Sequence, residues 1–74
     1  MENEETSDLI EEIIIFFQAQ IKAGSYRSIL YEDYLKALYR YMYIVHYKKE
    51  NLSDKQLSNL MNLVDKMKEV ESDK

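Results

Sequence analysis

The chain has 74 residues and contains no cysteine, no proline and no tryptophan, and it has a single glycine. The missing cysteine excludes disulfide bridges, thiolate metal ligands and thiol chemistry. The missing proline and the near-absence of glycine favour helices, because these residues punctuate other architectures far more often. The longest uninterrupted apolar run, residues 13–17, is much shorter than the ~20 residues that span a bilayer. We therefore expect a helical chain without a membrane partner.

The length permits one domain at most. A core this small supplies only about 3–5 kcal/mol, and small natural scaffolds usually gain further stability from disulfides, a metal or another chain. Because disulfides are excluded, we expect a bound partner or self-association, with a homodimer as the expected form. Residues 1–5 are acidic where a secretory signal would be basic, and a cytoplasmic location is therefore expected.

Charge is distributed unevenly along the chain, although the net charge is only −4. Residues 1–21 carry six acids and no base, residues 22–49 carry six bases and two acids, and residues 50–74 carry six acids and four lysines. The chain thus has acidic ends and a basic middle, and all seven tyrosines lie in that middle, between positions 26 and 47.

Helical periodicity predicts three helices, at about 8–23, 26–49 and 54–71, with frayed ends at 1–7 and 72–74. Ser7 or Asp8 is expected to cap the first helix, and Gly24 supplies the left-handed conformation that ends it. The second helix begins at Ser25 or Ser28, which the sequence does not separate. The short connections predict an all-α, small antiparallel three-helix bundle that forms a single domain over 8–71 and can self-associate.

The third helix has the clearest start signal in the chain. Ser53 and Gln56 fit a capping box, and Leu52 and Leu57 occupy the two ends of a hydrophobic staple. Apolar spacing then predicts the buried stripes of the bundle. They are Leu9, Ile10, Ile13, Ile14, Phe16, Phe17 and Ile21 in the first helix; Tyr31, Tyr34, Leu35, Leu38, Met42 and Val45 in the second; and Leu57, Leu60, Met61, Leu63, Val64, Met67 and Val70 in the third.

The second helix carries more aromatic side chains than its main stripe can hold. Tyr39, Tyr43 and Tyr47 recur every four residues, which places them above one another on one flank with His46 beside them. Tyr41 falls on the other flank, and Ile15 of the first helix lies opposite its own apolar face. Tyrosine and arginine dominate binding hot spots, so a protein-binding surface is one interpretation. Its predicted residues are Tyr39, Arg40, Tyr41, Tyr43, His46, Tyr47 and Ile15. Packing of the rings at the edges of an ordinary core is an equally weighted alternative.

Two further functions are compatible with the pattern. Interleaved aromatic and basic residues, as in Tyr39-Arg40-Tyr41, could stack on bases and neutralise phosphates of a nucleic acid in a transcriptional regulator. Net acidity and only two arginines disfavour this. Alternatively, the acidic first helix could mimic nucleic acid in a phage or mobile-element inhibitor of a host enzyme. Dipole complementarity explains those acids without any function, however.

Catalysis, metal binding and cofactor binding are not expected from this sequence. There is no Gly-rich phosphate loop, no paired histidine motif and no nucleophile with an evident base. His46 is the only histidine, and such a lone residue is far more often packed than catalytic. Small acidic helical proteins include bacteriocin-immunity proteins, antitoxins and phage-encoded inhibitors, but no motif here selects one of them. The sequence therefore favours a non-enzymatic regulator or inhibitor that acts by protein–protein contact.

Overall fold

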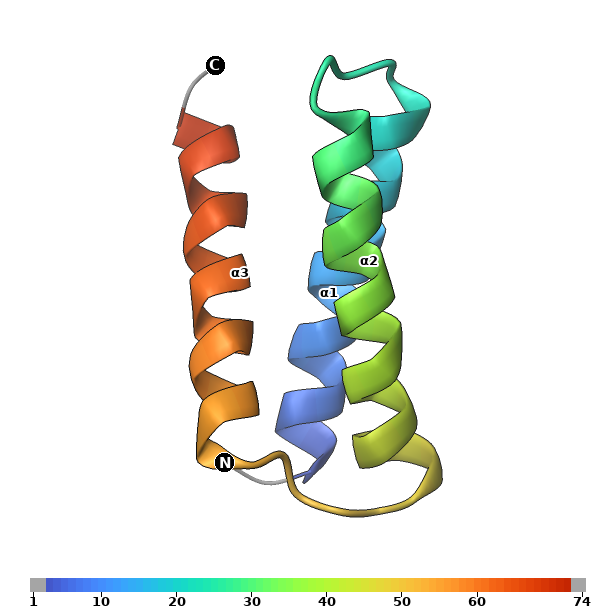
Figure 1. Cartoon of the computed structure of the whole chain (residues 1–74), viewed down its shortest axis with the longest axis vertical. Helices are drawn as coiled ribbons and strands as arrows, with labels where there is room; N and C mark the ends of the chain where they lie inside the picture. The colour runs from blue at the N-terminus through green and yellow to red at the C-terminus, as the bar shows by residue number, and fades with distance from the viewer. Residues whose placement is uncertain (1–2, 73–74) are drawn as a thin grey trace.

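The computed structural model describes residues 3–72, which form three α-helices. They are α1 (Asn3–Lys22), α2 (Ser28–Met42) and α3 (Asp54–Ser72), and a π-helical turn, η1 (Tyr43–Tyr47), continues α2. In Figure 1 the chain rises along α1, descends along α2 and rises again along α3. No strand occurs in these residues, and the predicted all-α three-helix bundle is confirmed. None of the described helices is long and apolar enough to cross a membrane.

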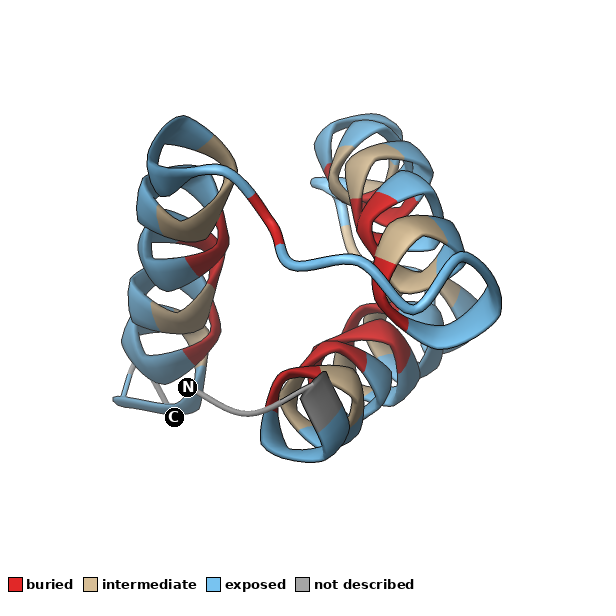
Figure 2. Cartoon of the chain, turned by 90° about the horizontal axis from the view of Figure 1, so that it is seen from below, coloured by how far each residue is buried: buried red, intermediate tan, exposed pale blue. Residues whose placement is uncertain are grey.

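The core lies between the three helices, and Figure 2 shows the buried residues facing this shared interior. Phe17 of α1 is its largest fully buried side chain, and its ring centroid lies 4.9 Å from that of Tyr31 and 5.3 Å from that of Tyr34 in α2. Leu60 of α3 is also fully buried. The predicted stripes supply most of this core, to which Tyr41 and Leu52 are added. Of the stripe residues only Met61 is exposed, because its neighbours Leu60 and Leu63 occupy the side of α3 that faces the bundle.

The first helix begins earlier than predicted, at Asn3 instead of residue 8. Glu4 and Glu5 occupy its first turn, where carboxylates interact favourably with the positive end of the helix dipole. Thr6 is buried and therefore holds this turn against the bundle. The prediction that 3–7 would not be helical is therefore wrong, while residues 1–2 and 73–74 of the predicted frayed ends lie outside the described residues.

Gly24 ends the first helix, as predicted, with a φ of 81°. Its N–H donates to the carbonyl of Ile21 at 3.0 Å, and the N–H of Ser25 donates to the carbonyl of Gln20 at 3.2 Å. These two bonds form a Schellman motif, which satisfies carbonyls that the last helical turn leaves free. A glycine is favoured here because a residue with a Cβ rarely adopts this φ.

The second helix departs most from its predicted limits of 26–49. Regular α-helix begins at Ser28, whose hydroxyl donates to the Ser25 carbonyl at 2.6 Å, so both candidate serines take part in the turn. It ends at Met42, and η1 follows, with the Lys48 N–H donating to the Tyr43 carbonyl five residues earlier at 3.1 Å. Lys49 then adopts a φ of 58°, which turns the chain away from the helix axis.

The start of α3 matches the predicted capping box. The Ser53 N–H donates to Oε1 of Gln56 at 2.9 Å, and the Gln56 N–H donates to Oγ of Ser53 at 3.2 Å. Leu52 is buried in the core and Leu57 packs against that core, which is compatible with the predicted staple. This reciprocal cap fixes where the third helix starts and how the chain enters it.

Substitution Ser53→Ala removes the acceptor for the Gln56 N–H and should lower the free energy of unfolding by about 1 kcal/mol. Urea denaturation followed by circular dichroism measures this loss. Ser58→Ala is the matched control, because Ser58 is an exposed residue inside α3 and alanine is at least as good a helix former. Equal midpoints for Ser53→Ala and wild type would show that the cap contributes nothing.

Candidate protein-interaction face

Tyr39, Tyr43 and Tyr47 form the tyrosine ladder, which runs from the end of α2 into η1. Their exposed fractions are 48%, 57% and 71%, so about half or more of each residue remains in water in a single copy of the chain. The ring centroids of Tyr43 and Tyr47 lie 5.9 Å apart with a 31° angle between the planes. The π-helical turn thus holds two neighbouring rings together at the surface. Burial at the edges of the core, the alternative interpretation, does not occur for these three residues.

The first residue of the ladder is attached to α1 by a hydrogen bond. The Nε2 amide of Gln18 donates to the hydroxyl of Tyr39 at 2.7 Å. Gln18 lies one turn beyond Ile15, whose exposed fraction is 58%. Ile15 is therefore one turn away from the residue that binds Tyr39, and both Ile15 and the ladder contribute apolar surface that the bundle leaves uncovered. Arg40 is exposed beside the ladder and forms no ion pair with a described residue.

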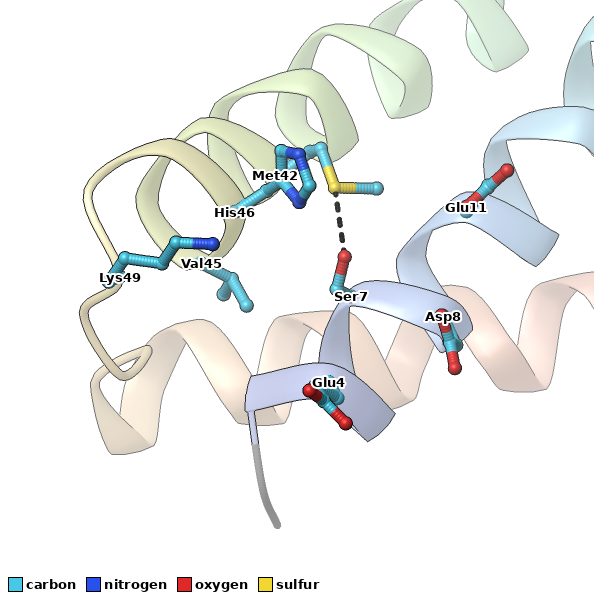
Figure 3. A pocket seen from close by; sticks show the side chains of 8 residues that line it. All are labelled: Glu4, Ser7, Asp8, Glu11, Met42, Val45, His46 and Lys49. Carbon is cyan, nitrogen blue, oxygen red and sulfur yellow. Dashed lines mark hydrogen bonds between the residues drawn. The ribbon is translucent and has the colours of Figure 1, made fainter.

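His46 connects the ladder to a depression between α1 and η1. Its ring lies 5.1 Å from that of Tyr47, edge to face at 89°. Figure 3 shows the depression, in which Ser7 and Met42 point toward each other and Oγ of Ser7 lies 3.5 Å from Sδ of Met42. The lining residues are Glu4, Ser7, Asp8, Glu11, Met42, Val45, His46 and Lys49. Carboxylates of the acidic first helix and the side chain of Lys49 thus share this depression with His46.

Tyr41 does not belong to this face, and its predicted place on an exposed flank is wrong. Only 7% of the residue is exposed, and it lies in the core cluster with Leu38 and Val45. Tyr34, Leu38, Tyr41 and Val45 are spaced by four, three and four residues, which aligns them on one side of the helix. The buried side of α2 and η1 is therefore wider than the main stripe predicted, and it includes this tyrosine.

A second group of exposed apolar residues was not identified from the sequence. Tyr26, Ile29 and Leu30 lie at the turn between α1 and α2 and at the start of α2. Tyr26 is held by its neighbour: Nε of Arg27 donates to its hydroxyl at 2.9 Å, and the guanidinium lies 5.2 Å from the ring centroid. This hydrogen bond raises the pKa of Arg27 above its ordinary value. The exposure of Ile29 could have been recognised from the sequence. Ile29 lies seven residues before Lys36, which is about two helical turns, so both residues fall on the polar side of the same helix.

The face offers flat rings, phenolic hydroxyls and a guanidinium, which are groups that bind by contact and hydrogen bonding. Among the described residues, no three histidine or acidic side chains come together to hold a metal ion. Comparison of the chain with protein-family models, with curated proteins and with solved structures finds no match, so what it binds has to be inferred from its own residues.

Proposed function

We propose that this chain is a small protein-binding module, a regulator or inhibitor without catalytic activity, whose tyrosine ladder contacts a protein partner. The observation that carries the proposal is the exposure of Tyr39, Tyr43 and Tyr47, none of which is less than 48% exposed. A tyrosine side chain offers a large amphipathic contact area and loses little conformational entropy on binding, because it has only two rotatable torsions. Tyrosine is enriched at interfaces for this reason. Three such rings on consecutive turns form a contiguous surface, whereas isolated exposed apolar residues need no explanation.

The charges in the depression next to His46 favour a protein over a nucleic acid. Glu4, Asp8 and Glu11 line the depression that His46 joins to the ladder, and none of them forms an ion pair with another described residue. Phosphates entering this depression would meet three carboxylates and one lysine, and the net repulsion opposes binding there. A protein surface avoids this cost by placing apolar or cationic side chains there.

Replacing Tyr43 and Tyr47 together with alanine should weaken partner binding by roughly 30-fold or more, since a hot-spot tyrosine contributes about 2 kcal/mol and tenfold corresponds to about 1.4 kcal/mol. Both residues are exposed, so the helical circular dichroism spectrum should not change. The tagged chain is used to capture partners from a lysate of its own host. Mass spectrometry identifies the captured proteins, and titration with each purified partner then gives the affinity.

Met61→Ala with Lys55→Ala is the matched control, because it removes an exposed apolar and an exposed charged side chain from α3. This control should bind as wild type does. Retention of every partner by the Tyr43→Ala, Tyr47→Ala variant would contradict the proposal. Complex formation with DNA or RNA that weakens steeply as salt is added would instead favour the nucleic-acid alternative.

A further inference from the structure

A second row of exposed residues runs along α2 and η1 and shares Tyr43 and Tyr47 with the ladder. It consists of Ile29, Asp33, Lys36, Arg40, Tyr43 and Tyr47, and we call it the outer seam. Successive members are four, three, four, three and four residues apart, and all six are exposed. Apolar residues repeated at this spacing pack one helix along another, and here the two ends of the row are apolar or aromatic while its centre is charged.

The outer seam is approximately symmetric about Lys36, except that Tyr47, eleven residues after it, has no counterpart. Ile29 and Tyr43 lie seven residues to either side of this lysine, and Asp33 and Arg40 lie three and four residues to either side. A row with this symmetry is complementary to itself when a second row runs in the opposite direction. If the two rows are related by a two-fold axis, every contact between them occurs twice. An interface of this kind, in which both copies use the same surface, is isologous.

We propose that two copies of this chain pair through their outer seams, antiparallel and with the two-fold axis at Lys36, so that Asp33 of each copy faces Arg40 of the other and Ile29 faces Tyr43. The inference rests on the proposed protein-binding function of this side of α2 and names the second copy as its occupant. Tyr39 and His46 stay outside the seam.

Charge complementarity identifies the second copy as the partner. Arg40 has no ion pair with a described residue, and the only ion pair of Asp33 with a described residue is an exposed one, with its Oδ1 4.0 Å from Nζ of Lys36. A carboxylate and a guanidinium therefore lie at similar distances from the axis, three and four residues along the helix. A parallel pairing would place Asp33 on Asp33 and Arg40 on Arg40, and like charges directly opposite repel. The two Lys36 side chains meet at the axis, but each can turn its ammonium toward Asp33 of its own helix.

The proposed interface is small. Residues 29–47 span about 27 Å of helix at 1.5 Å per residue, and a single pair of helices of this length buries less surface than a standard interface. We therefore expect a weak dimer that dissociates on dilution. The charged centre differs from the apolar core of a stable interface, which is consistent with a weak dimer and with a monomer that stays in solution.

Charge reversal tests both the partner and the direction of pairing. Asp33→Arg alone and Arg40→Asp alone should each weaken the dimer at least tenfold in sedimentation velocity measurements, because each places like charges together. An equal mixture of the two variants should recover dimer, since both contacts of the mixed pair then join an arginine to an aspartate. At one contact the two substituted side chains face each other, and at the other the two native ones do. The double variant Asp33→Arg, Arg40→Asp should also dimerise as wild type does.

Disulfide trapping provides an independent measurement in a chain that has no cysteine. Lys36→Cys places one thiol on each side of the axis, and mild oxidation should link two copies in high yield. Lys55→Cys, on the exposed side of α3, is the matched control and should remain monomeric. A chain that stays monomeric at millimolar concentration, or a dimer that neither charge reversal weakens, would overturn the inference.

The two proposals fail separately. If the chain is monomeric, and the Tyr43→Ala, Tyr47→Ala variant no longer binds a different protein partner, the pairing is overturned. The protein-binding function is then still supported. Retention of both the dimer and every other partner by that variant overturns the function and the pairing together, because Tyr43 belongs to both surfaces.

Discussion

Phe17→Ala should leave most of the protein unfolded at room temperature. Phe17 is fully buried and contacts three aromatic rings, those of Phe16, Tyr31 and Tyr34, with centroid distances between 4.9 and 5.3 Å. Deleting a buried phenylalanine ring costs about 3–5 kcal/mol, through lost transfer free energy and the cavity left behind. A core of this size supplies about the same amount in total. The loss should appear as a strongly reduced helical circular dichroism signal before any denaturant is added.

Phe16→Ala is the control for this experiment, because it removes the same atoms from the next position, which is only partly buried. It should shift the urea midpoint by much less than Phe17→Ala does. Equal shifts for the two variants would contradict the assignment of Phe17 to the centre of the core, and so would an unchanged midpoint for Phe17→Ala.

Leu60→Ala should separate α3 from the rest of the bundle more readily than it unfolds α1 and α2. Leu60 is the one fully buried residue among the described residues of α3, and truncating a buried leucine costs about 2–5 kcal/mol. The extensive aromatic contacts of the core join α1 to α2 and do not involve α3. Native-state hydrogen exchange should therefore show α3 amides exchanging through a local opening of lower free energy.

The neighbouring substitution Met61→Ala, at an exposed position, should leave exchange in α3 nearly unchanged. Uniform acceleration across all three helices in Leu60→Ala would mean that the bundle opens only as a whole. That result would contradict the weaker attachment of α3 to the hairpin of α1 and α2.

The sequence predicts the ends of helices correctly where the hydrogen bonds that form them join residues within a few positions of one another. The Ser53–Gln56 cap and the Gly24 terminus depend on hydrogen bonds within one turn, so the sequence is sufficient to locate them. The start of α1 was missed because Thr6, a polar residue, is buried by the rest of the bundle. The π-helical turn was missed as well, since Leu38, Met42 and Val45 have the spacing of an ordinary α-helix.

The candidate face was predictable in part for the same reason. Four-residue spacing places Tyr39, Tyr43 and Tyr47 on one flank of the second helix, and these tyrosines are exposed because other residues of the three helices fill the core. Tyr41 could not be assigned from periodicity alone, because its burial depends on how broadly the other helices cover α2. The depression beside His46 joins residues of α1 and η1, a juxtaposition that only tertiary structure creates.

The hydrogen bond between Gln18 and Tyr39 distinguishes Tyr39 from the other two tyrosines of the ladder. The Tyr39 hydroxyl already has a donor on α1, whereas the hydroxyls of Tyr43 and Tyr47 have no hydrogen bond to a described residue. A fixed ring loses little rotamer entropy when a surface closes over it, and two unbonded hydroxyls can still adjust to whatever acceptor they meet. In the proposed interface, Tyr39 would thus be the preorganised anchor, and its two neighbours would supply the adaptable contacts.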